Sequence, residues 1–352
     1  MERYSETTDK RKWIYFGIDL HRIQWHVTIR TEDVEMFNGS IPGTWEALKR
    51  LLDRYPAYAK QAVYEAGYFG FWLYDHLMDY GVDCVVTPPS LVPQEYGNHV
   101  KTDRRDSRKL AHLLAKGLLK RVWVPTVQQR YERQVIRTRR QLIRDRVRIQ
   151  NRIKAELRFY GIDLPAPTGQ WSKAYFENLQ RLRMGNQWMQ ESFGRLLEEY
   201  QFLSQQVERQ TKVLRALAET PEYAERVQIL RSTPGIGLIS AMEYLLELQD
   251  IERFRRSNRL AAYVGLTPSQ YSSGEKVRMG RITAIGKNDL RGTLVEVAWR
   301  LIAKDPAMRE KYERIKARAG SKRAIIAIAR TTLLRTRRML LDRQPYVVGL
   351  AA

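Results

Sequence analysis

Four acidic residues stand where the chain is expected to pass from one secondary-structure element to the next. Asp19 ends the run WIYFGID, and Glu65 closes the strand-like part of QAVYEAG. Asp103 and Asp106 lie in KTDRRDSRKLAHLL, where a spacing of three residues puts them on one face of a helix. Carboxylate oxygens bind hard divalent cations such as Mg²⁺. Two such ions, about 3.5–4 Å apart, would clamp the attacking and leaving oxygens of a phosphoryl transfer.

Basic residues flank the aspartate pair, namely Lys101, Arg104 and Arg105. An Asp-x-x-Asp pair by itself is more typical of a solvated helix face than of a metal site. Four carboxylates at the ends of elements of one fold favour the metal site, with Mg²⁺ as the expected ion and Mn²⁺ as the alternative. The three basic residues would then hold the backbone of a polyanionic substrate.

The elements that must position these carboxylates lie in residues 13–125, where strand-like and helix-like patterns alternate. The expected order is strand, strand, strand, helix, strand, helix, strand, helix, which is the order of an RNase H-like (RuvC-like) α/β fold. The strand-like runs are WIYFGID, IQWHVTI, VEMFNGS, QAVYEAG and VDCVVTP. In that fold the first and fourth strands are neighbours at the sheet centre. Asp19, Glu65 and the predicted helix of residues 102–119 should therefore converge.

Two histidines, His21 and His26, flank the second predicted strand. They lack the spaced histidine pair of single-strand nicking nucleases, so neither is assigned a part in the chemistry. His26 is expected to pack on the sheet.

The chain has 352 residues, with 61 Lys plus Arg against 39 Asp plus Glu, which gives a formal net charge of +22. This excess favours a large polyanionic partner, because neutralising phosphates releases counterions. No apolar run is long enough to span a bilayer and no signal peptide is evident, so we expect a cytoplasmic protein without a membrane partner. The single cysteine, Cys84, excludes an intramolecular disulfide and a cysteine-based zinc site.

Residues 126–220 form a second predicted domain, a long helical hairpin or coiled coil. Val135, Leu142 and Ile149 recur there at heptad spacing. Basic residues recur every three or four positions and would share one helix face: Arg133, Arg137, Arg140, Arg144, Arg148 and Arg152. A solvated face usually mixes both signs, so this face is expected to bind nucleic acid, first of all through Arg133, Arg137, Arg140 and Arg144.

Residues 221–345 form a third predicted domain, which is mostly α-helical. VQILRSTPGIGLISAMEYLLEL predicts a helix, a tight turn and a second helix, as in a helix-hairpin-helix motif. Gly235 and Gly237 would let backbone amides approach a phosphate at the helix N-terminus. The alternative is that the glycine pair only makes a turn. SKRAIIAIARTTLLRTRRMLL predicts an amphipathic basic helix near the C-terminus.

Between these helices the stretch YVGLTPSQYSSGEKVRMGRITAIGKND is expected to be rich in loops. Ser273 precedes a glycine there, and Lys276, Arg278 and Arg281 follow closely. A serine hydroxyl becomes a nucleophile beside a general base or a metal. The basic residues could bind DNA and stabilise a pentavalent phosphate transition state. On chemistry alone, however, Ser-Ser-Gly is more often a flexible turn.

Several runs together resemble the DEDD transposases of bacterial insertion sequences, a class of serine recombinases related to the Piv-type DNA invertases. These runs are YFGIDLHR, AVYEAGYFGFWLYDHL, VKTDRRDSRKLAHLL, STPGIGLISA, RFRRSNRLAAYVGLTPSQYSSG and GRITAIGKNDLR. The resemblance covers nearly the whole chain, from Phe16 to the C-terminal helix. It implies metal binding by the four carboxylates, Asp19, Glu65, Asp103 and Asp106.

The same resemblance implies an activity and partners. Ser273, with the adjacent Ser272 as second choice, would attack the DNA backbone after activation by carboxylate-bound Mg²⁺. The substrates would be donor and target DNA, and a noncoding bridge RNA would pair with both. A homo-oligomer is implied as well, a dimer that pairs into a tetramer in the synapse, where serine and carboxylates meet from different subunits.

Two other functions fit parts of the sequence. A RuvC-like junction-resolving nuclease would use the four carboxylates and water, and it would leave the serine loop without a task. A non-catalytic nucleic-acid-binding scaffold would have solvated carboxylates, and Mg²⁺ would then change neither its activity nor its stability. Steep salt dependence of binding is expected of all three functions, so it does not separate them.

Overall fold

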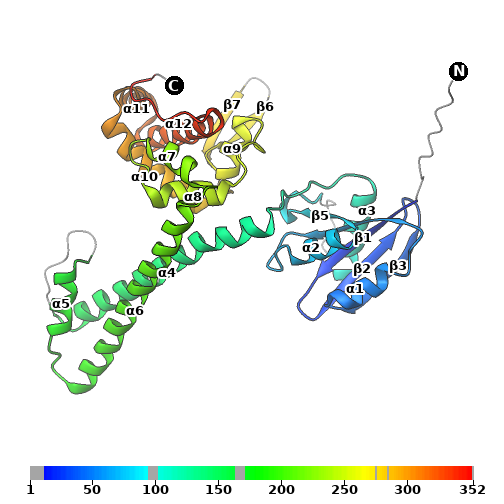
Figure 1. The fold of residues 1–352 in the computed structure, drawn as a ribbon, viewed down its shortest axis with the longest axis horizontal. Helices are drawn as coiled ribbons and strands as arrows, with labels where there is room; N and C mark the ends of the chain where they lie inside the picture. Colours follow the sequence, from blue (N-terminus) through cyan, green and yellow to red (C-terminus); the bar gives the residue numbers. More distant parts are fainter. Residues whose placement is uncertain (1–11, 94–101, 163–170, 274–275, 284, 351–352) are drawn as a thin grey trace. The chain divides into compact units, whose positions relative to one another are not determined.

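The computed structural model describes residues 12–93, 102–162, 171–273, 276–283 and 285–350 (Figure 1). The chain divides into two compact units between Val124 and Pro125. The predicted helical hairpin and the C-terminal segment belong to the same unit, and their division into two domains stays a prediction.

The N-terminal unit contains a five-stranded sheet in the order β3-β2-β1-β4-β5. Its strands are β1 (Trp13–Leu20), β2 (Gln24–Arg30), β3 (Glu35–Pro42), β4 (Ala59–Glu65) and β5 (Asp83–Thr87). The first three strands pair antiparallel, whereas β4 and β5 run parallel to β1. The expected position of the first and fourth strands as neighbours is therefore confirmed, and the order agrees with an RNase H-like arrangement.

Helices cover both faces of this sheet. They are α1 (Trp45–Leu52), α2 (Trp72–Asp79) and α3 (Asp103–Ala115), with a short 3₁₀ turn η1 (Pro89–Leu91) after β5. Strand residues alternate between two cores, as the two-residue period of a strand requires. Phe16 and Ile18 pack with the helices α1 and α2, whereas Tyr15 packs with Leu110 and Leu114 of α3 on the opposite face.

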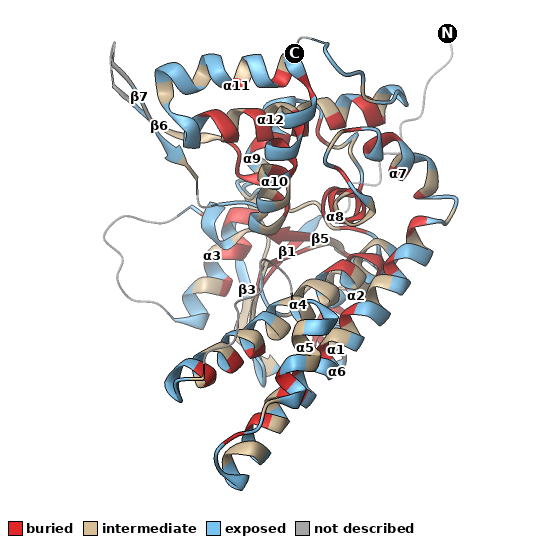
Figure 2. Ribbon diagram, turned by 90° about the vertical axis from the view of Figure 1, so that its left-hand side faces the viewer, coloured by how far each residue is buried: buried red, intermediate tan, exposed pale blue. Residues whose placement is uncertain are grey.

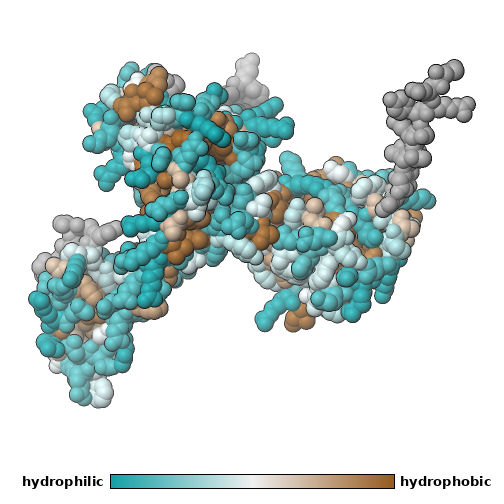
Figure 3. All heavy atoms as spheres, in the orientation of Figure 1, coloured by the Kyte–Doolittle hydropathy of each residue, from teal (hydrophilic) through white to brown (hydrophobic). Residues whose placement is uncertain are grey.

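The long helices of the C-terminal unit are α4 (Val127–Phe159) and α6 (Gln187–Ala218), with the short α5 (Lys173–Arg181) between them. Ile149 and Ile153 near the end of α4 share a core with Phe193 and Leu197 near the start of α6, so the two helices are antiparallel (Figure 1). A capping box at Thr126 begins α4. Hydrophilic side chains cover most of the visible surface of both units (Figure 3).

The remainder of this unit packs around one large core. Its elements are α7 (Ala224–Arg231), α8 (Leu238–Leu248), α9 (Ser257–Val264), β6 (Pro268–Ser273), β7 (Lys276–Ile282), α10 (Asn288–Lys304), α11 (Pro306–Ala319) and α12 (Ser321–Asp342). Every residue of α8 from Ala241 onward is buried, and α12 carries a continuous row of buried residues (Figure 2). No helix of the described part of the chain is long and apolar enough to cross a membrane.

The expectation of a loop-rich stretch before α10 is wrong for residues 268–273 and 276–282. These residues form the antiparallel hairpin β6-β7, a two-stranded sheet. Glycine, proline and lysine are depleted in strands, so the composition of this stretch did not indicate pairing. The hairpin gives the serines a defined place at the end of a strand.

Candidate functional site

Two of the predicted carboxylates leave the sheet at the same edge. β1 and β4 are parallel, and Ile18 pairs with Tyr64 in their register. The next residue of each strand is Asp19 and Glu65, so both carboxylates stand at the carboxyl ends of adjacent strands. Asp19 is partly buried and Glu65 is exposed.

Close contact with β1 positions the helix α3. A Cβ atom on Gly17 would lie 2.1 Å from the carbonyl oxygen of Ser107 and 2.4 Å from the amide nitrogen of Ala111, so only glycine permits this approach. On the neighbouring strand, the hydroxyls of Thr28 and Ser107 form a buried hydrogen bond of 2.8 Å. Thr102 caps the helix through its side chain. The first turn of α3 is thereby held at the end of β1.

Three side chains converge at this point: Asp19, His21 and Asp103. The His21 Nε2 atom lies 3.0 Å from Asp19 Oδ2 and 3.4 Å from Asp103 Oδ1. One donor atom from each residue lies within 4.8 Å of the other two. The expected convergence of Asp19 and Asp103 is therefore present. Asp106 and Glu65 lie outside this group of three.

The pKa of Asp19 is raised above its ordinary value, first of all by burial. The hydrogen bond and charge of His21 oppose this rise in pKa, and the carboxylates of Asp103 and Asp106 raise the pKa further. A cation placed among these groups would relieve the repulsion. Carboxylate oxygens with an imidazole nitrogen form a donor set that fits a divalent metal ion.

His21 is not among the site residues that the sequence predicts, although it stands two residues after Asp19. Because β1 ends at Leu20, the chain turns there, and the turn brings the imidazole back beside the carboxylate. The position of a candidate ligand just beyond a strand end was the available signal.

The basic residues around the aspartate pair have different environments. Arg104 donates from Nε to Asn38 Oδ1 at 2.9 Å, so β3 anchors it. The neighbouring Arg108 forms a bidentate pair with Glu35, each bond 2.7 Å long. Arg105 is exposed. Lys101 lies outside the described residues.

The arginine face of α4 differs from the open basic surface that the sequence predicts. Arg133 is buried and donates from Nε to the carbonyl oxygen of Leu246 at 3.1 Å. Arg137 binds both carboxylate oxygens of Glu247, at 3.0 and 3.1 Å. At this end of α4 the arginines therefore dock the helix onto α8, and nucleic-acid binding by them stays a prediction.

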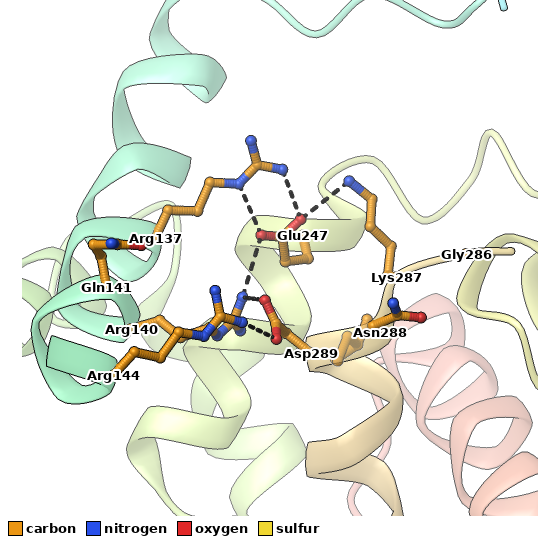
Figure 4. A pocket seen from close by; sticks show the side chains of 10 residues that line it. Arg137, Arg140, Gln141, Arg144, Glu247, Gly286, Lys287, Asn288 and Asp289 are labelled. Carbon is orange, nitrogen blue, oxygen red and sulfur yellow. Dashed lines mark hydrogen bonds and ion pairs between the residues drawn. The ribbon is translucent and has the colours of Figure 1, made fainter. Parts of the chain in front are cut away.

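The paired arginines line a pocket of about 320 Å³ between α4, α8 and the start of α10 (Figure 4). Arg140 pairs with Glu243 and, at 2.8 Å, with Asp289, which also pairs with Arg144. Burial raises the pKa of Glu247, but the hydrogen bond from Arg137 and the charge of Lys287 lower it to about 2. Glu247 is thus ionised, with Arg137 and Lys287 as its cationic partners.

The turn between α7 and α8 contains the two glycines of the predicted helix-hairpin-helix. Gly235 has a φ of +95°, and a Cβ atom there would lie 2.7 Å from Arg300 Cβ. Gly237 begins α8, and its amide donates to Ser240 Oγ at 2.9 Å. Packing and backbone conformation therefore explain why residue 235 is a glycine, and no bound phosphate is needed for this explanation. Phosphate binding by this turn stays a prediction.

The candidate serines end the strand β6. Ser272 pairs with Val277 and Ser273 with Lys276 across the hairpin. Arg278 and Arg281 of β7 are exposed. The side chains of Ser272, Ser273 and Lys276 lie outside the described part of the structure, as do residues 274 and 275.

Comparison with known proteins assigns the chain to a family. The profile of the DEDD transposases of the IS110 type matches residues 16–162, and that of the "Transposase IS116/IS110/IS902 family" matches residues 227–313. The chain belongs to the DEDD transposase family of insertion sequences. Both the segment with the candidate metal site and the segment with the serine hairpin fall within these matches.

Individual members of this transposase family resemble the chain over most of its length. It is 29% identical to the putative transposase y4qE of Sinorhizobium fredii over 93% of this chain and 81% of that protein. The transposase for insertion sequence element IS1533 of Leptospira borgpetersenii is 25% identical over 96% of this chain and 98% of its own length. The transposase for IS1111A of Coxiella burnetii is 26% identical over 70% and 67%, respectively.

Proposed function

We propose that this chain is a DNA transposase that excises and inserts a mobile element by phosphoryl transfer, with an RNase H-like metal centre and a serine nucleophile. Family membership supports the transposase activity. The observation that carries the metal centre is the convergence of Asp19 and Asp103 from elements far apart in the chain. The strand order supports the RNase H-like assignment, because it brings Glu65 to the same sheet edge.

In this proposal the carboxylates hold Mg²⁺, with Mn²⁺ as a substitute. Asp19 and Asp103 would be direct ligands, and Asp106 and Glu65 would complete the set. The ion would supply activation of the serine hydroxyl and stabilisation of charge on the transferred phosphoryl group. Arg104 and Arg105, on exposed positions of the same helix, would bind the DNA backbone beside it.

Ser273 is the proposed nucleophile. Its Oγ would form a bond to a DNA phosphorus, the bond from that phosphorus to the adjoining deoxyribose oxygen would break, and the released oxygen would take up a proton. Ser273 stands at the end of β6, and the exposed Arg278 lies across the hairpin opposite Tyr271, two residues from the serine, which supports this role. Arg278 would bind the phosphate that the serine attacks, and Arg281, opposite Ser269 at the other end of the hairpin, would bind DNA farther along.

Guidance and assembly follow the family resemblance. A bridge RNA that pairs with donor and target DNA would choose the sites, and dimers would join into a tetramer in the synapse. The net charge of +22 supports a partner with many phosphates. Structured RNA that co-purifies with the protein and is encoded beside its gene would be the direct evidence.

The serine assignment is tested by recombination between a donor and a target plasmid. Ser273→Ala should abolish recombination and the covalent protein–DNA adduct on a nicked suicide substrate, while the matched Ser272→Ala control retains both. Full activity of Ser273→Ala would show that the serine is not the nucleophile. Hydrolysed ends that never rejoin would favour the junction-resolving nuclease instead.

A further inference from the structure

We propose that His21 is a ligand of the metal ion in this centre, so that the site is a mixed nitrogen–oxygen site and not one of carboxylates alone. The inference rests on the proposed metal centre and deepens it. It concerns a residue outside the four carboxylates, and it predicts which metals the site prefers.

The distances around His21 are those between neighbouring ligands of one ion. Two ligands at a right angle on an octahedral ion, with bonds of about 2.1 Å, are about 3.0 Å apart. The His21 Nε2 atom lies 3.0 Å from Asp19 Oδ2 and 3.4 Å from Asp103 Oδ1. A single ion can therefore contact all three atoms with little movement of the side chains. Each ligand comes from a different element: β1, the turn after β1, and α3.

Three other described histidines have structural partners that explain their positions. His26 bonds to Ser40 Oγ at 3.0 Å and to Asn38 Oδ1 at 3.3 Å within the sheet. His112 contacts Arg30 at 2.9 Å, and His76 packs against the rings of Trp45 and Trp72. His21 instead directs its Nε2 at two candidate metal-binding carboxylates, and about half of its side chain is exposed.

The chemistry of the donor gives the consequence. Imidazole nitrogen binds transition-metal ions well, whereas Mg²⁺ prefers oxygen ligands. His21 should therefore raise the affinity for Mn²⁺ and Co²⁺ more than the affinity for Mg²⁺. Without His21 the centre would approach a carboxylate-only site.

A second account of the same distances makes the opposite prediction. His21 could instead bridge the two carboxylates as a hydrogen-bonding partner that a metal ion displaces. Removal of His21 would then leave Mn²⁺ affinity unchanged or increase it, because a competitor of the metal has been removed.

The test is Mn²⁺ and Mg²⁺ binding to the full-length protein without nucleic acid. Mn²⁺ titrations followed by electron paramagnetic resonance, with Mg²⁺ as competitor, give both affinities. The variants are His21→Ala and His21→Asn, with His26→Ala as the matched control on the same sheet. Nitrogen modulation in the pulsed spectrum of bound Mn²⁺ reports imidazole coordination directly.

We expect His21→Ala to weaken Mn²⁺ binding by about tenfold or more, since even indirect partners of metal ligands contribute that much. Mg²⁺ affinity should fall by less, and the nitrogen modulation should disappear. His26→Ala should change none of these. Unchanged or stronger Mn²⁺ binding by His21→Ala, with the modulation absent from the wild type, would overturn the inference.

Asp103→Asn separates failure of this inference from failure of the proposed centre. If Asp103→Asn weakens Mn²⁺ binding and His21→Ala does not, the metal centre stands and the histidine ligand is wrong. If neither substitution changes Mn²⁺ binding, the metal centre itself is wrong, and the ligand role of His21 is wrong with it.

Discussion

The carboxylates around Asp19 in the N-terminal unit and the carboxylate of Glu247 in the C-terminal unit are both close to other charges, but the charges differ in sign. Burial raises the pKa of Asp19, His21 opposes this, and the nearby carboxylates of Asp103 and Asp106 raise it further. Glu247 has Arg137 and Lys287 as partners, and its pKa is lowered to about 2. A bound cation would relieve the repulsion among the carboxylates around Asp19, whereas Glu247 already has cationic partners that stabilise the fold.

The largest expected effect is a loss of recombination when one of the carboxylates around Asp19 is replaced. Asp103→Asn should reduce recombination by at least about 10²–10³-fold, the effect of removing one electrostatic stabiliser of a transition state. Its free energy of unfolding should stay within about 0.5 kcal/mol of the wild type, because Asp103 is exposed. A donor–target assay and chemical denaturation measure the two quantities. If Asp103→Asn retains wild-type recombination, the carboxylates around Asp19 have no part in the chemistry.

Replacing Glu247, which lies among opposite charges, should instead change the stability of the protein. Glu247→Gln should lower the free energy of unfolding by about 3 kcal/mol. The reason is that Arg137 and Lys287 would lose the buried carboxylate that is their counterion. Chemical denaturation of the full chain measures this. Glu198→Gln, which breaks an exposed pair with Arg195 on α6, is the matched control and should change stability little. Equal effects of the two substitutions would contradict a structural role for Glu247.

The pH dependence of the unfolding free energy tests whether the charge of Glu247 is the cause of this stabilisation. Its pKa in the folded protein is about 2, below the ordinary value of 4.5, so the folded state binds this proton less tightly than the unfolded state. The stabilisation is fully present above pH 4.5 and is lost as pH falls toward 2. The difference in unfolding free energy between wild type and Glu247→Gln should therefore shrink over that interval. A constant difference would show that the charge is not responsible.

A smaller difference in stability is expected between alanine substitutions of the two glycines before α8. Gly235→Ala should destabilise the protein by about 1–3 kcal/mol, because a positive φ is strained for alanine and its Cβ would contact Arg300. Gly237 has an extended backbone and open space around it, so Gly237→Ala should cost at most about 1 kcal/mol. Chemical denaturation ranks the two. Reduced DNA binding by stable Gly237→Ala would favour a phosphate-binding turn.

The sequence predicted the features that depend on local pattern. A run of strand-forming residues placed Asp19 at the end of the first strand, and the spacing of Asp103 and Asp106 placed both on one face of the helix that is α3. The strand order then followed from chain connectivity rules for such folds. These features need only neighbours in sequence and a small set of permitted topologies.

Other features depend on partners that sequence spacing does not reveal. Glu247 lies 110 residues from Arg137, so the pairing that fills the arginine face of α4 was not visible in the helix periodicity. The rotation of His21 toward Asp103 depends on the turn after β1, and the β6-β7 pairing depends on backbone hydrogen bonds between polar residues. Pattern analysis therefore predicted the carboxylates of the candidate site and not the imidazole beside them.

The most direct test of the central claim is thermal unfolding of the full-length protein with Mg²⁺ or Mn²⁺ and with a chelator, at matched ionic strength. A ligand that binds only the folded state at 100 times its dissociation constant stabilises it by about 2.7 kcal/mol. If the carboxylates around Asp19 bind metal, either metal should raise the unfolding temperature of the wild type, and Asp19→Asn should remove most of this rise. An unfolding temperature that is the same with metal and with chelator would contradict it.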